Sequence, residues 1–144
     1  MDRRTQHLFL ALIGAQVMHS LEEFAFRLFD VFAPVRFLSG LVSADRALGF
    51  AAINVGICLF GFWCWFAWVR RRAPSAAVWM WGWSLVELTN GTGHLVFAAL
   101  RGGYFPGAAT APLLLALSAT LLYRLARPDE AKSLASTGRL PHLR

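Results

Sequence analysis

The chain has 144 residues, enough for one domain, and it is 57% hydrophobic and only 15% charged, with a mean hydropathy of +0.50. Soluble domains carry about 25% charged residues, and here the apolar residues form long runs, which is typical of an integral membrane protein. The formal net charge of +6 does not indicate nucleic-acid binding, because the basic residues stand singly or flank the apolar runs.

Four apolar segments, each near the length of about 17–25 residues that a membrane span needs, predict an all-α fold: an integral membrane, four-helix transmembrane bundle. Residues 1–144 are expected to form this single transmembrane domain. The predicted helices cover residues 6–32, 47–69, 75–100 and 110–125. Pro34 is expected to stop the first helix, and residues 35–46 are expected to form a loop with a short apolar piece.

Aromatic residues gather near the end of the second predicted helix and at the start of the third, as in the aromatic belt at a membrane interface. Between these two helices lie three consecutive arginines, Arg70 to Arg72, and Pro74. Residues 101–109 are rich in glycine and end the third helix. The fourth helix is nearly featureless and stops at Pro128, so residues 128–144 are predicted to be a loose cytoplasmic tail.

Most lysines and arginines fall on the side of the predicted bundle that carries both termini and the Arg70–Arg72 turn. The positive-inside rule therefore predicts cytoplasmic termini, in what we expect to be a bacterial inner membrane. In this orientation the first and third helices both run outward. Their polar residues then lie at similar depth, in the outer-leaflet half of the bilayer.

Two clusters of polar side chains interrupt the apolar runs. They are His19, Glu22 and Glu23 in the first helix and Glu87, Asn90 and His94 in the third. Spacings of i, i+3, i+4 and i+7 place the members of each cluster on one helical face. Because a charged group at membrane depth costs at least ~2.5 kcal/mol, such groups are functional-site candidates. We expect the two faces to meet and build one site.

Imidazole and carboxylate are ligands of zinc and of iron, so the clusters predict a divalent metal site, with zinc as first choice and iron as second. The predicted ligands are His19, Glu22, Glu23, Glu87 and His94. One metal is preferred to two, because the order His-x-x-Glu reverses the Glu-x-x-His of di-iron bundles. The predicted catalytic residues are Glu22, as general base, Asn90 and Tyr104.

The predicted function is a small intramembrane enzyme that acts on a lipid-like or apolar substrate, most simply by hydrolysis with a metal-activated water. One alternative is a metal-free isomerase that uses glutamate and histidine as acid and base. A second alternative is a non-catalytic membrane protein that binds a metal or a small ligand. The expected partners are the lipid bilayer and a lipid-like small molecule, without nucleic acid, and monomer and homodimer both stay open.

Three pieces of sequence occur in the order H-x-x-E-E, N-x-x-x-H and Y-x-P-G. They are His19/Glu22/Glu23, Asn90/His94 and Tyr104/Pro106/Gly107. This pattern resembles the HXXEE family of small integral membrane proteins. The resemblance implies that these residues matter, and it implies no particular reaction. A weaker similarity links Glu22, Glu23 and Arg27 to the E-E-x-x-x-R motif of the CAAX-type intramembrane proteases, whose later histidine and asparagine pieces are arranged differently.

Overall fold

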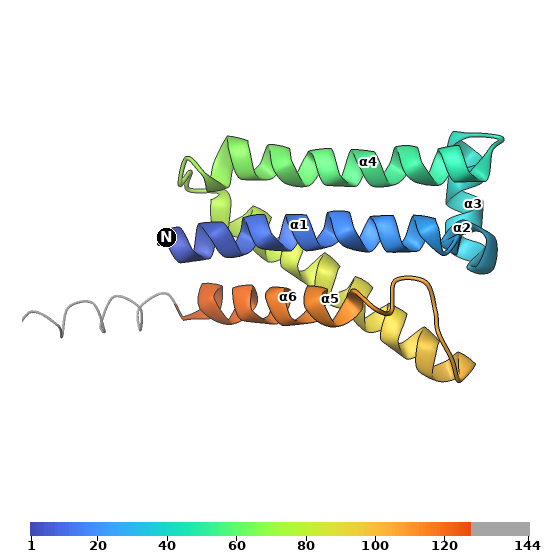
Figure 1. Ribbon diagram of the computed structural model, residues 1–144. Coiled ribbons are helices and arrows are strands. Elements are labelled where there is room, and N and C mark those ends of the chain that lie inside the picture. Colours follow the sequence, from blue (N-terminus) through green and yellow to red (C-terminus); the bar gives the residue numbers. More distant parts are fainter. Residues whose placement is uncertain (128–144) are drawn as a thin grey trace, which may run out of the picture.

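The computed structural model describes residues 1–127, and every regular element within them is helical. The predicted all-α fold is therefore confirmed. The long helices are α1 (Arg3–Ala25), α4 (Arg46–Cys64), α5 (Ala76–Arg101) and α6 (Ala111–Ala126). α1 lies between α4 and α6, and α5 crosses the other three obliquely (Figure 1). The predicted tail, 128–144, lies outside the described residues.

Two of the described helices are long and apolar enough to cross a membrane. One is α1, and the other is α4 continued by the π-helix η1 (Trp65–Val69). The outer face of α4 exposes large apolar side chains, among them Leu48, Val55 and Leu59, each more than half exposed. α6 is apolar but has only 16 residues.

The first helix ends at Ala25, seven residues before the predicted end at residue 32. Arg27 takes a left-handed conformation with φ of 55°, which L-residues cannot continue as a helix. Two short helices follow, α2 (Leu28–Val31) and α3 (Ala33–Val42), so most of the predicted loop over residues 35–46 is helical. Pro34 does not stop a helix but lies in the first turn of α3, where its missing N–H is not needed.

Hydrogen bonds connect the π-helix η1, at the end of α4, to the start of α1. Its wider turn leaves carbonyl groups available, and the buried Gln6 amide of α1 donates to Val69 O at 2.7 Å and to Arg70 O at 3.3 Å. The helix bounds of α4 with η1, α5 and α6 agree with the predicted 47–69, 75–100 and 110–125 to within a residue or two.

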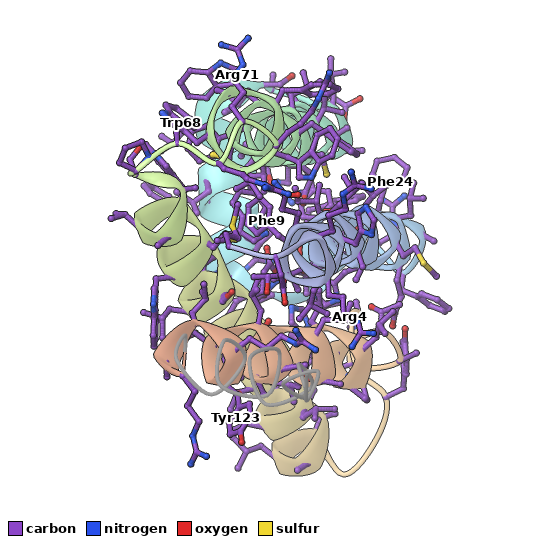
Figure 2. All side chains as sticks on the ribbon, turned by 90° about the vertical axis from the view of Figure 1, so that its left-hand side faces the viewer. Arg4, Phe9, Phe24, Trp68, Arg71 and Tyr123 are labelled. Carbon is purple, nitrogen blue, oxygen red and sulfur yellow. The ribbon has the colours of Figure 1, made fainter. Side chains whose placement is uncertain are left out.

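Two apolar clusters enclose the polar part of α1. Phe9, Leu12 and Ile13 are fully buried in the first cluster, and Figure 2 shows Phe9 in the interior of the bundle. Phe29 lies in the second cluster, beyond the end of α1. Between the clusters, α1 buries four polar residues: Gln16, His19, Ser20 and Glu23.

Candidate metal centre

Three of the predicted site residues meet at a single point in the bundle interior. The Oε1 atom of Glu23 lies 3.5 Å from His19 Nε2 and 3.1 Å from His94 Nε2. One ligand atom from each residue falls within 4.8 Å of the others. The side chains are buried, with exposed fractions of 0% for His19 and 6% for Glu23 and His94. As predicted, polar residues of α1 and α5 meet.

The orientation of the His94 ring is fixed by a backbone carbonyl. His94 Nδ1 lies 2.6 Å from Pro106 O in the segment that joins α5 to α6. A carbonyl oxygen only accepts hydrogen bonds, so Nδ1 carries the proton. In a neutral His94, Nε2 therefore carries the lone pair, and this atom lies 3.1 Å from Glu23 Oε1.

The His19 ring is fixed in the same sense by Thr110. His19 Nδ1 lies 2.7 Å from Thr110 Oγ1, and the Thr110 hydroxyl donates its one proton to Glu22 Oε2 at 2.6 Å. Thr110 Oγ1 then accepts from His19 Nδ1–H. The buried His19 Nε2 has no hydrogen-bonding partner among the described residues, and it lies 3.5 Å from Glu23 Oε1.

An imidazole nitrogen that carries a lone pair and a carboxylate oxygen at these distances repel each other unless a proton or a cation lies between them. Ligand atoms on a tetrahedral ion about 2.0–2.1 Å away lie roughly 3.3 Å apart. The distances of 3.5 and 3.1 Å between Glu23 Oε1 and the two Nε2 atoms are close to this value. Histidine ligands of metals commonly donate their second ring N–H to a carbonyl or to an oriented acceptor, as His19 and His94 both do. The donor set could therefore hold a divalent ion.

Glu22, predicted as a ligand and as the general base, is directed away from this group. Its carboxylate holds the α5–α6 segment: Oε1 accepts from Tyr104 OH at 2.5 Å, from Gly107 N at 3.1 Å and from Ala109 N at 3.0 Å. Oε2 accepts from the backbone N of Thr110 at 2.8 Å in addition to its hydroxyl. The negative charge also lies at the positive end of the α6 dipole. Glu22 is thus an anchor of the segment that orients both histidines.

Tyr104, predicted as catalytic, also belongs to this anchor. Its side chain is half-exposed, its hydroxyl donates to Glu22, and its ring lies 4.9 Å from that of Phe26. Partial desolvation, the hydrogen bond to Glu22 and the charge of that carboxylate raise the pKa of Tyr104 to about 12. The hydroxyl is therefore a donor at neutral pH, directed at Glu22 rather than at the histidines.

Gly107 is the point of closest approach between the α5–α6 segment and the two rings. Its φ is +93°, which favours glycine. A Cβ at this position would lie 2.5 Å from His94 Nδ1 and 2.8 Å from His19 Cε1, closer than real Cβ contacts. Each named residue of Y-x-P-G thus has its own role. Tyr104 donates to Glu22, the Pro106 carbonyl accepts from His94, and Gly107 leaves room for the two rings.

Glu87 and Asn90 lie beside the three-residue group rather than within it. Glu87 is 2% exposed, and the Gln16 amide, turned so that its nitrogen faces α5, donates to Glu87 Oε2 at 2.7 Å. Asn90 stands one turn after Glu87 on the same face of α5, and the charge of Glu23 is near enough to act on Glu87. Glu87 is therefore a neighbouring carboxylate.

Sequence reasoning missed Thr110 and Gln16. Thr110 follows the Y-x-P-G piece at the start of α6, where a hydroxyl residue is typical of a helix beginning. Gln16 stands one turn before His19 on the same face of α1, a polar residue in an apolar run. Both signals were present in the sequence, and neither tells which atom the side chain contacts.

Most of the chain matches a known protein family. Residues 10–122 match a family described as "Protein of unknown function with HXXEE motif". No curated protein and no solved structure matches the chain. The matched range runs from α1 through most of α6 and includes every residue that contributes to the centre. The chain belongs to the HXXEE family.

Proposed function

We propose that this protein is a small intramembrane, metal-dependent enzyme in which His19, Glu23 and His94 hold one divalent cation. Zinc is the first choice and iron the second, since two imidazoles and a carboxylate suit both ions. One observation carries the proposal: acceptors hold both Nδ1–H groups, and the two Nε2 atoms lie 3.5 and 3.1 Å from the same oxygen of Glu23. Catalytic zinc sites have three protein ligands of these types and an open fourth position.

The membrane placement is supported by the two helices of spanning length and by the apolar outer face of α4. We propose a four-helix transmembrane bundle in a bacterial inner membrane. A soluble monomer rarely exposes a contiguous apolar surface of this kind. The arginines near the start of α1 and the end of η1 favour cytoplasmic termini, which puts the metal centre in the outer-leaflet half.

The proposed reaction is hydrolysis of a lipid-like or apolar substrate that enters from the bilayer. A bound divalent ion lowers the pKa of a coordinated water toward neutrality and polarises a carbonyl or phosphoryl oxygen. Because five donors occupy Glu22, Glu87 is the carboxylate left to act as general base. Exposed apolar residues of α1, including Met18 and Leu21, surround the polar face and suit a lipidic substrate.

A non-catalytic metal-holding protein is the second candidate. It is favoured by the burial of the three ligand side chains, of which the most exposed is only 6% accessible. In that case the segment over residues 102–110 would close the centre permanently. Metal-dependent hydrolysis of a lipid ester by the purified protein would separate the enzyme from this candidate.

Metal analysis of purified protein tests the ligand set. After reconstitution with zinc and removal of the excess, we expect one zinc per chain, and we expect His19→Ala, His94→Ala and Glu23→Gln to weaken binding by at least about 100-fold, because each removes a ligand. The matched control is His7→Ala, which replaces an exposed histidine on the same helix and should retain the metal. A wild-type protein that binds neither zinc nor iron would contradict the proposal and favour the metal-free isomerase.

A further inference from the structure

One end of the bundle gathers arginines from three helices. Gln6 near the start of α1 contacts the backbone of Val69 and Arg70, and Asp2 lies 3.5 Å from Arg124 of α6. These contacts bring the start of α1, the end of η1 and the end of α6 together. Figure 2 looks onto this end, with Arg4 and Arg71 at its surface.

The charge at this end is strongly positive. The arginines are Arg3, Arg4, Arg70, Arg71, Arg72, Arg124 and Arg127. Among residues 1–127 the one carboxylate at this end is that of Asp2, and it already accepts from Thr5 N and pairs with Arg124. The described part of this end therefore carries seven arginines and one carboxylate.

A groove of about 440 Å³ opens beside this cluster, lined by Trp63, Phe66, Ala67, Arg70 and Arg71. The Arg70 guanidinium lies over the Phe66 ring, 5.6 Å from the ring centroid. It therefore covers part of one face of that ring. Trp63 and Phe66 are 54% and 50% exposed. The groove thus has a cationic part, Arg70 and Arg71, next to an apolar aromatic part.

We propose that this groove binds the headgroup of an anionic phospholipid, with the phosphate on Arg70 and Arg71 and the upper acyl chains against Trp63 and Phe66. This inference rests on the membrane placement proposed above and does not involve the metal. Charge complementarity selects the occupant, because guanidinium groups recognise phosphate well and juxtamembrane basic clusters attract anionic lipids. Tryptophan beside arginine is suited to the interfacial depth at which headgroups lie.

A second groove at the opposite end of the bundle offers a matched comparison. It is also lined by an aromatic residue and two arginines, Phe37, Arg36 and Arg46. Here, however, the acidic Asp45 directly precedes Arg46, and Asp30 pairs with Arg27 nearby in the chain. The local charge is closer to balance, so the lipid preference is expected at the Arg70–Arg71 groove alone.

The test uses the full chain extracted from membranes in a neutral detergent and titrated with dioleoyl phosphatidylglycerol or dioleoyl phosphatidylcholine, with bound lipid counted by native mass spectrometry. We expect tighter binding of phosphatidylglycerol. We expect Arg70→Ala with Arg71→Ala to weaken it about thirty-fold, at about five-fold for each guanidinium. Arg36→Ala with Arg46→Ala should change it by less than about two-fold. A thermal melt of each variant in the same detergent reports whether it is folded.

Equal affinity for the two lipids, or equal loss in both double variants, would overturn the proposal. Inorganic phosphate that displaces phosphatidylglycerol completely at millimolar concentration would also overturn it, since the site would then bind a free anion. Failure of the membrane placement is a different result, because the chain would then appear in the soluble fraction before any lipid is added.

Discussion

Gly107→Ala is expected to abolish tight metal binding and to lower the free energy of unfolding by about 2–5 kcal/mol. The new Cβ would lie 2.5 Å from His94 Nδ1 and 2.8 Å from His19 Cε1, and the backbone φ of +93° is unfavourable for alanine. The segment must then move away from both rings, which breaks the hydrogen bond between His94 Nδ1 and Pro106 O. Thermal melts in detergent and zinc titration measure the two effects.

Gly102→Ala separates the backbone cost from the steric cost. Gly102 also has a positive φ, +64°, but a Cβ there meets nothing within 4 Å. We therefore expect a loss of about 1–2 kcal/mol with unchanged zinc affinity. Equal effects of the two substitutions would contradict the close approach of Gly107 to the histidines.

Glu22→Gln is expected to lower the free energy of unfolding by about 3 kcal/mol or more and the zinc affinity by about 10–100-fold. The glutamine has one acceptor oxygen where the carboxylate has two, so its amide nitrogen must face at least two donors of the α5–α6 segment. Thr110 would lose the partner that orders its hydroxyl, and His19 would lose its fixed tautomer. Zinc titration and thermal melts again provide the measurement.

Asp30→Asn is the matched control, since it removes the same charge from a carboxylate in an exposed pair with Arg27. An exposed ion pair contributes less than about 1 kcal/mol, and Asp30 does not contact the centre. If Glu22→Gln were as mild as Asp30→Asn, the carboxylate of Glu22 would not anchor the segment.

The helical period and the apolar runs were sufficient to predict the long helices and to bring His19, Glu23 and His94 together. These inferences depend only on which residues share a helical face. The end of α1 could not be predicted in this way. Residues 25–32 contain neither glycine nor proline, and the chain turns at Arg27, a non-glycine residue in a left-handed conformation that no composition rule indicates.

The sequence also could not predict that Glu23 meets the histidines while Glu22 binds the α5–α6 segment. Adjacent helical residues point about 100° apart, so both could face one site at the resolution of a periodicity argument. Which of them meets the histidines depends on the path of residues 102–110, which return to α1 and present backbone N–H groups to Glu22. The partner of His94 is likewise a backbone carbonyl, and no side-chain pattern encodes it.

X-ray absorption at the zinc K edge of the reconstituted protein tests the metal centre most directly. We predict nitrogen or oxygen ligands at about 2.0–2.1 Å with outer-shell scattering from two imidazoles, reduced to one imidazole in His94→Ala if that variant is loaded at high zinc. Scattering from sulfur at about 2.3 Å, or a spectrum without imidazole, would contradict the assignment of His19 and His94 as ligands.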